Sequence, residues 1–202
     1  YASYEINNWN GIFSSDSEYL SLINLARVRQ ISVMDQLDLN EHLSKIERDK
    51  LDAIEKEIKS YKNVYGLIDF TDMIQKFLDK DVTPDFDVIF VDEAQDLSLI
   101  QWAMINKIEK DTNCDVWVAG DDDQAIFGWA GADVDSFINY NAREIPLKQS
   151  ERVPSIIQEI ALNVITRIEE NRIDKEYFPK SETGEIFERY RLSDIDMSTG
   201  DW

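Results

Sequence analysis

The sequence predicts an α/β protein in which helices flank a parallel β-sheet, with a helical N-terminal part. Two short, largely apolar runs, residues 86–91 and 115–119, each end in acidic residues, as buried parallel strands do. Helical segments alternate with these runs, and such alternation favours a parallel sheet with right-handed crossovers. The 202 residues suffice for one domain, or for one domain and part of another.

Charge and composition narrow the class of protein. The chain carries 41 acidic and 21 basic residues, a formal net charge of −20, which by itself argues against nucleic-acid binding. A hydrophobic content of 43% excludes a disordered chain. The chain has one cysteine, so it cannot form an internal disulfide. It also has one histidine, so His42 is the single candidate for the histidine of a Ser–His–Asp triad. No apolar run reaches the roughly 20 residues of a membrane helix, so we expect a soluble cytoplasmic protein.

The first part of the chain predicts helices. Residues 1–13 show no clean period and are interpreted as irregular, whereas residues 17–29 place apolar side chains on one helical face. Residues 38–62 predict one long helix, because Asp38 can act as its N-cap and Glu41 can complete a capping box. Residues 69–80 predict a sharply amphipathic helix, whose apolar residues follow helical spacing: Phe70, Met73, Ile74, Phe77 and Leu78.

Strands and helices alternate in the rest of the chain. A helix is predicted at residues 97–108 between the two strands, and Trp102 and Trp117 are interpreted as packing residues. A third short strand is predicted at residues 144–147. The apolar period after Pro154 predicts a helix, because proline suits a first helical turn. A further strand is predicted at residues 185–189.

Acidic side chains follow both predicted strands. Asp92 and Glu93 come directly after the first strand, and Asp121, Asp122 and Asp123 follow the second. Ligands of open α/β sheets bind at the carboxyl ends of the strands, where carboxylate oxygens suit a hard cation such as magnesium. The alternative is that these residues cap the helices that follow. Two clusters on successive strands favour the ligand site.

Four segments form motifs: residues 68–73 (Ile-Asp-Phe-Thr-Asp-Met), 92–96 (Asp-Glu-Ala-Gln-Asp), 120–132 (Gly-Asp-Asp-Asp-Gln-Ala-Ile-Phe-Gly-Trp-Ala-Gly-Ala) and 147–152 (Leu-Lys-Gln-Ser-Glu-Arg). In this order they resemble the Asp-Phe-x-Asp segment, the Walker B motif, motif III and motif IV of superfamily 1 DNA helicases of the UvrD/Rep/PcrA family. The resemblance covers residues 66–168. It implies a RecA-like sheet of the P-loop NTPase type, present here in incomplete form.

The resemblance also implies roles in ATP hydrolysis. Asp92 would hold Mg²⁺, and Glu93 would orient and deprotonate the attacking water. Gln124 would sense the γ-phosphate of ATP. Arg152 would be an arginine finger that stabilises charge on the same phosphate in the transition state.

The same resemblance implies contacts with single-stranded DNA and duplex junctions. Phe127 and Trp129 would stack on bases, which tolerates any sequence, although a core role is the alternative for Trp129. Two residues depart from the family pattern: Ala130 stands where arginine is usual, and Glu151 where tyrosine is usual. Glu151 or another surface acid is an alternative partner for Arg152.

One expected motif is missing from the 202 residues. No segment reads Gly-x-x-x-x-Gly-Lys-Ser/Thr, the loop that wraps nucleotide phosphates. We therefore expect that loop upstream of Tyr1, most of a second RecA-like domain beyond Trp202, and negligible ATP hydrolysis by the chain alone. The predicted parts are a helical region (1–65), the C-terminal part of a first RecA-like domain (66–141) and the start of a second (142–202).

The sequence thus predicts an internal fragment of an ATP-dependent DNA helicase from a bacterial or phage-infected cell. One alternative is a nuclease or polymerase-type enzyme that binds two metals with the two acidic clusters. Another is a non-catalytic interaction module derived from a helicase. The sequence indicates no oligomeric state.

Overall fold

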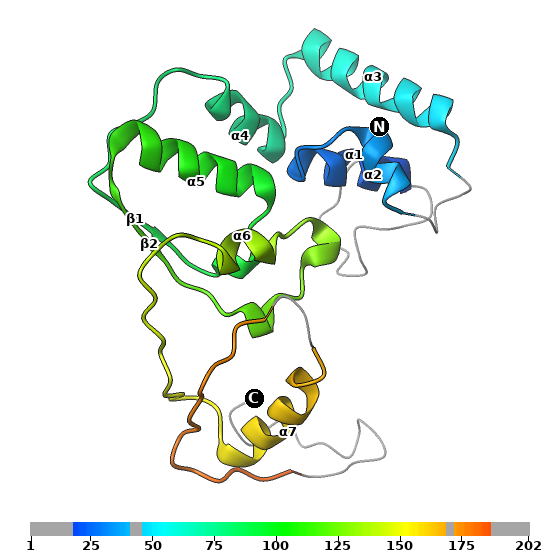
Figure 1. Ribbon diagram of the computed structural model, residues 1–202. Helices are drawn as coiled ribbons and strands as arrows, with labels where there is room; N and C mark the ends of the chain where they lie inside the picture. The colour runs from blue at the N-terminus through cyan, green and yellow to red at the C-terminus, as the bar shows by residue number, and fades with distance from the viewer. Residues whose placement is uncertain (1–17, 41–45, 169–171, 187–202) are drawn as a thin grey trace, which may run out of the picture. The chain divides into compact units, whose positions relative to one another are not determined.

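The computed structural model describes residues 18–40, 46–168 and 172–186 (Figure 1). The chain divides into two compact units, residues 1–140 and 141–202, and each is described here by itself. None of the described helices is both long and apolar enough to span a membrane.

Three helices form the N-terminal part of the first unit: α1 (Glu18–Val28), α2 (Val33–Asp38) and α3 (Arg48–Tyr65). Helix α1 confirms the helix predicted at residues 17–29. The three helices pack around one apolar core, because each places aliphatic side chains on its inner face. The buried core residues are Leu22, Ile23, Ala26, Val33, Leu37, Ile46 and Leu51.

The long helix predicted at residues 38–62 is wrong at its start. Ser32 caps a separate short helix by accepting a hydrogen bond from the Asp35 backbone NH, so Asp38 is the last residue of α2 rather than an N-cap. Helix α3 begins ten residues later, at Arg48. Glu41 and His42 lie outside the described residues.

Two further helices lie side by side in the first unit, α4 (Phe70–Leu78) and α5 (Leu99–Thr112) (Figure 1). Both were predicted, and each begins with a capping box. Asp69 and Asp72 close the box of α4, and Ser98 and Gln101 close that of α5. Each box satisfies backbone NH groups that a helix start leaves without intrahelical partners.

The sheet consists of two parallel strands, β1 (Val88–Val91) and β2 (Asp115–Val118), which confirms both predicted strands and the α/β class. Along both strands, exposed side chains alternate with partly buried ones, so the described chain covers one face of the sheet. On the covered face lie Ala94, Trp102 and Ile105, so the packing role predicted for Trp102 is confirmed.

The other face of the sheet contradicts the prediction of fully buried strands. Phe90 is 79% exposed and Trp117 is 56% exposed, and their rings stack with centroids 6.4 Å apart. The packing role predicted for Trp117 is therefore wrong within the described residues. The physical reason is that Phe90 and Trp117, which are register partners, occupy the exposed alternate positions of their strands, opposite the covered face.

Four short helices follow the strand ends, and the sequence period did not predict them. They are η3 (Ala94–Asp96), η4 (Asp122–Gln124), η5 (Gly128–Ala130) and α6 (Val134–Ile138). Helix α6 packs against η3 and η4. Elements of three to five residues are too short for a 3.6-residue period to appear in the sequence.

The second unit contains the predicted helix after Pro154, α7 (Ser155–Ile165), with Pro154 as its N-cap. The strand predicted at residues 144–147 is wrong, because these residues have no strand partner in the described chain. The pairing occurs just beyond, where the Ser150 NH donates to the Phe178 carbonyl (2.9 Å) and the Phe178 NH donates to the Lys148 carbonyl (2.7 Å). Residues 185 and 186 form no strand, and 187–189 lie outside the described residues.

Candidate active site

The loops that follow β1 and β2 meet at one edge of the sheet. The Ala119 NH donates to the Val91 carbonyl (2.8 Å), and the Ala94 NH donates to the Ala119 carbonyl (3.0 Å). These bonds extend the parallel pairing past the last residues of both strands. They bring the two predicted acidic clusters together.

Gln95 connects the two clusters. Its side chain, 1% exposed, donates from Nε2 to Glu93 Oε2 (2.9 Å) and accepts at Oε1 from the Asp121 NH (3.0 Å). Gly120 permits this approach, because a Cβ at that position would lie 2.7 Å from Gln95 Oε1. A buried amide with both ends bonded fixes its neighbours in one arrangement.

Gln124 extends the connection. It ends η4, and its Nε2 donates to Asp121 Oδ2 at 2.7 Å, while Asp121 Oδ1 accepts from the Asp123 NH. Glu93, Gln95, Asp121 and Gln124 therefore form one hydrogen-bonded chain, called here the strand-end network. Glu93 and Gln124, which were predicted as site residues from two separate motifs, both belong to the strand-end network.

Sequence reasoning missed the role of Gln95. The available signal was its place two residues after Glu93, in a turn that directly follows a strand. A buried amide there has few ways to satisfy both its donors and its acceptor. In the structure the Gln95 carbonyl oxygen accepts from the loop after β2, while its amide nitrogen donates to Glu93 in the same turn.

Glu93 has an unusual backbone conformation, with φ 50° and ψ 42°. This left-handed region is disfavoured for residues other than glycine, and such conformations cluster at functional sites. The turn directs the exposed carboxylate of Glu93 to the edge of the sheet, where Gln95 holds one of its oxygens.

Asp92 precedes Glu93 and is exposed, with Oδ1 accepting from the Glu93 NH at 2.9 Å. Mg²⁺ is usually held by one or two carboxylates, water and substrate phosphates, and an exposed aspartate at a strand end fits that donor set. Among residues 18–40, 46–168 and 172–186, no group of three or more His, Cys, Asp or Glu side chains could hold a metal ion.

The aromatic pair Phe127 and Trp129 lies at η5. The ring centroids are 6.2 Å apart and the ring planes are inclined by 52°. Trp129 is 49% exposed, so the core alternative for this tryptophan is wrong. Both rings present apolar surface to solvent.

Arg152 belongs to the second unit and is exposed. Its backbone NH donates to Ser150 Oγ (3.2 Å), and the Val153 NH donates to the same oxygen (2.9 Å). The buried Ser150 thus fixes the backbone on both sides of Arg152. In the described part of the chain the guanidinium forms no ion pair, with Glu151 or with any other acid.

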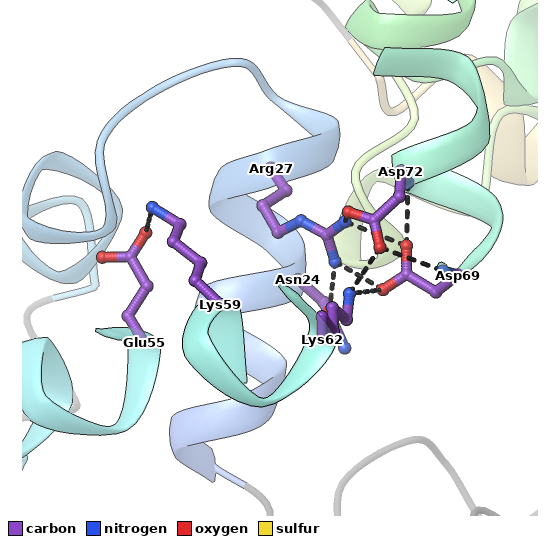
Figure 2. Close-up of polar contacts among 7 residues, drawn as sticks. All are labelled: Asn24, Arg27, Glu55, Lys59, Lys62, Asp69 and Asp72. Carbon is purple, nitrogen blue, oxygen red and sulfur yellow. Dashed lines mark hydrogen bonds and ion pairs between the residues drawn. The ribbon is translucent and has the colours of Figure 1, made fainter. Parts of the chain in front are cut away.

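The Asp-Phe-x-Asp segment has a different role from the strand ends. Figure 2 shows Asp69 and Asp72 facing Arg27 and Lys62, a group called here the ion-pair cluster. Arg27 binds both oxygens of Asp69, at 2.7 and 2.9 Å, and also contacts Asp72 at 2.5 Å. Lys62 contacts both aspartates. The cluster ties the ends of α1 and α3 to the start of α4.

The pKa values of the ion-pair cluster follow from these contacts. Burial of the Asp69 carboxyl would raise its pKa, but hydrogen bonds from Arg27 and Lys62 outweigh burial and hold the pKa well below the ordinary range. The hydrogen bond to Asp69 raises the pKa of Arg27 in turn. Asp69 and Arg27 therefore stay charged at neutral pH, so this pair is suited to holding helices together rather than to proton transfer.

Comparison with known proteins places residues 5–144 in a defined family. They match the model of the UvrD/REP helicase N-terminal domain. The DNA helicase II of Escherichia coli (strain K12) is 34% identical over 139 residues, which is 62% of this chain and 19% of that protein. The ATP-dependent DNA helicase PcrA of Leuconostoc citreum is 29% identical over 153 residues, 69% of this chain and 20% of that protein.

A third relative, the probable DNA helicase II homolog of Rickettsia felis, is 36% identical over 105 residues, 48% of this chain and 15% of that protein. The chain therefore spans about a fifth or less of the length of these relatives. The strand-end network and the aromatic pair lie inside the matched range, whereas Arg152 lies outside it.

Proposed function

The chain belongs to the UvrD/REP helicase family, and from this premise we propose that it is an internal part of an ATP-dependent DNA helicase. The whole protein would couple ATP hydrolysis to movement along single-stranded DNA and to unwinding of duplex junctions. Residues 1–65 would form a helical region, 66–141 the C-terminal part of a first RecA-like domain, and 142–202 the beginning of a second. The strand-end network carries the proposal, because it joins a candidate base to a candidate phosphate-binding amide.

The chemistry assigned to this site is hydrolysis of a phosphate anhydride. Bound ATP with Mg²⁺ supplies the phosphoryl group to be transferred. The carboxylate of Glu93 accepts a proton from the attacking water, and Asp92 contributes an oxygen to hold the metal. Gln95 leaves one oxygen of Glu93 for this task by bonding the other.

Two further residues would act on the γ-phosphate. The amide of Gln124 can donate to a phosphate oxygen and accept from water, and its bond to Asp121 connects it to Glu93 through Gln95. Arg152 would add a planar guanidinium that binds two phosphate oxygens. Its lack of an ion pair among the described residues supports this role.

DNA contact is assigned to the aromatic pair. Stacking on Phe127 and Trp129 needs no positive charge, so it is compatible with a chain of formal net charge −20. The 202 residues contain no loop of the Gly-x-x-x-x-Gly-Lys-Ser/Thr type. For that reason we propose that the chain alone hydrolyses ATP negligibly.

The proposal is tested in a longer protein that contains this chain and a phosphate-binding loop. Glu93→Gln keeps the shape of the side chain and removes the base, so ATP turnover should fall about 10²–10⁴-fold while nucleotide binding persists. Asp115→Asn, at the opposite end of β2, is the matched control and should leave turnover unchanged. Near-parental turnover in the Glu93 variant would reject Glu93 as the base.

A further inference from the structure

Arg29 connects the N-terminal helices to the aromatic pair. Its Nη2 donates to the Gly128 carbonyl (3.1 Å), and its Nη1 donates to Oε1 of Gln36 (3.2 Å). Gly128 lies between Phe127 and Trp129 in the sequence, so the first bond holds a peptide group that joins the two exposed rings. The second bond reaches toward the core of the N-terminal helices.

Gln36 is an unusual residue for this position. It lies on α2 between the core residues Val33 and Leu37, and its side chain is fully buried. Oε1 accepts from Arg29, but Nε2 has no hydrogen-bond partner in the part of the chain that the structure describes. A buried donor without a partner costs free energy, which an apolar side chain of similar volume would avoid. Stability alone therefore does not explain the amide, whereas the bond to Arg29 requires it.

The end of α1 fixes the backbone that carries Arg29. The Ile31 NH donates to the Ala26 carbonyl (3.0 Å). The Gln30 NH donates to the Arg27 carbonyl (3.2 Å), and Gln30 itself is left-handed, with φ 55°. These two bonds form a Schellman motif, which closes a helix in one defined geometry.

The same end of α1 contacts the aromatic segment a second time. Gly131 directly follows η5 and is buried, with φ 98°. A Cβ there would lie 2.5 Å from Cγ2 of Val28 and 3.2 Å from Cδ1 of Leu25, so only glycine permits this approach. Helix η5 is therefore held against α1 at both of its ends, by Arg29 at its start and by packing after its last residue.

We propose that Arg29 is a positioning residue for single-stranded DNA: anchored by Gln36, it holds the Gly128 peptide so that Phe127 and Trp129 are ordered before DNA binds. This inference rests on the stacking role proposed above for the two rings. Side chains that are already ordered lose less conformational entropy on binding, so the affinity for DNA is higher. Through Arg29 the N-terminal helices shape a surface that the loops after the strands present.

A direct contact between Arg29 and a DNA phosphate is the competing role, because arginine is a common phosphate ligand. Gln36→Met separates the two roles. It removes the acceptor that anchors Arg29, keeps the charge of the guanidinium, and also removes the unpaired buried donor, so it should not lower the midpoint of urea unfolding. Under the positioning role DNA binding weakens in this variant, whereas a phosphate contact would leave it unchanged.

DNA affinity is measured by fluorescence anisotropy with a fluorescein-labelled oligodeoxythymidine, in a longer protein that contains this chain and a phosphate-binding loop. Arg29→Met and Gln36→Met should each raise the Kd about three- to tenfold, because the rings must then be ordered on binding. Arg48→Met, which also removes a surface arginine, is the matched control and should have the parental Kd. In a Trp129→Ala background, Arg29→Met should change the Kd by less than about twofold, because no ring pair is left to order.

A second readout needs no DNA. In the 202-residue chain the ring centroids of Phe127 and Trp129 are 6.2 Å apart, so nuclear Overhauser effects should connect their ring protons. These signals should weaken in Arg29→Met and in Gln36→Met and persist in Arg48→Met. Undiminished signals in the first two variants would overturn the positioning role.

The affinities separate failure of this inference from failure of the stacking role. Parental affinity of Trp129→Ala would reject stacking by this ring, and the inference with it. Weaker binding by Trp129→Ala beside parental binding by Arg29→Met would reject the positioning role alone. Weaker binding by Arg29→Met beside parental binding by Gln36→Met would assign Arg29 to a phosphate contact, which also overturns the inference.

Discussion

The ion-pair cluster and the strand-end network both place carboxylates next to the end of an element, yet they differ in what neutralises them. Asp69 and Asp72 meet two cations, Arg27 and Lys62, within the same unit. The strand-end network is joined by amide and backbone donors, and Glu93 forms no ion pair in the described part of the chain. Charge that is compensated internally serves the fold, whereas charge that is left open is available to a ligand.

This difference predicts two separable sets of variants. Changes in the strand-end network should lower ATP turnover in a protein that contains this chain and spare its stability. Changes in the ion-pair cluster should lower the free energy of unfolding and leave ATP turnover unchanged.

The first prediction compares two arginines. Arg152→Lys keeps the charge but loses the planar fork, so ATP turnover should fall by a factor of about 10³, with nucleotide binding less affected. Arg27→Lys is the matched control and should change turnover little, because Arg27 binds aspartates rather than a ligand. Steady-state ATPase assays measure the turnover of both variants. Activity of Arg152→Lys within tenfold of the parent would remove Arg152 from the site.

The second prediction concerns Gln95, whose role is to position Glu93. Gln95→Met keeps the volume and removes both hydrogen bonds, so turnover should fall by about 10²-fold because the base is displaced. ATP turnover of the Gln95→Glu variant should fall by a similar factor, because the substitution places a second negative charge beside Glu93. Since a purely structural role would not alter proton transfer, the pH–rate profile is the second readout. An unchanged profile together with a lower Tm would assign Gln95 to the fold alone.

The strand-end network shows which features of the site could be predicted from the sequence. Glu93 and Gln124 could be named because their motifs carry a known chemistry, and the strands that deliver them have a clear apolar pattern. Gln95 could not, because its role depends on β1 and β2 being neighbours, which brings residues 26 positions apart into hydrogen-bond distance. Long-range contacts of this kind leave no local period in a sequence.

The helical part gives the converse lesson. The amphipathic period predicted α4 correctly, but it gave no sign that Asp69 and Asp72, read as a motif, would be held by Arg27 from α1. The start of α3 was missed because Asp38 resembles a helix cap, whereas the actual N-cap of α3, Glu47, forms no side-chain capping hydrogen bond. The exposed Trp117 was missed because an apolar strand reads the same whether one face or both are covered.

A third prediction concerns the aromatic pair, which is uncharged and so belongs to neither set of carboxylates. Trp129→Ala should weaken single-stranded DNA binding by about 1–3 kcal/mol with little sequence preference, because stacking is tolerant of the base. Fluorescence titration with oligonucleotides of different sequence measures this. Unchanged DNA affinity of the folded variant would show that the exposed Trp129 ring does not bind DNA.

The fourth prediction tests the ion-pair cluster by stability. Arg27→Met leaves two aspartates with Lys62 alone, and should lower the free energy of unfolding by about 1–2 kcal/mol, between the values for exposed and buried pairs. Arg48→Met removes the exposed pair with Asp38 and should cost about 0–1 kcal/mol. Urea unfolding of the 202-residue chain measures both. Equal costs for the two variants would show that the cluster adds nothing beyond a surface pair.

The smallest expected effect is a pH dependence carried by Asp69. Its pKa is lower in the folded chain than in the unfolded chain, where a value near 3.9 is usual, so the folded state binds the proton less well. The contribution of Asp69 is therefore fully present above about pH 5 and is lost as the pH falls toward the folded-state value. Because the side chain is partly exposed and screened by solvent, we expect less than about 1 kcal/mol from this residue. Urea midpoints measured between about pH 6 and pH 3 should fall more steeply in the parent than in Asp69→Asn, which cannot titrate at this position. Parallel profiles for the two proteins would show that other carboxylates cause the acid sensitivity, and that the cations of the ion-pair cluster do not hold Asp69 in its charged form.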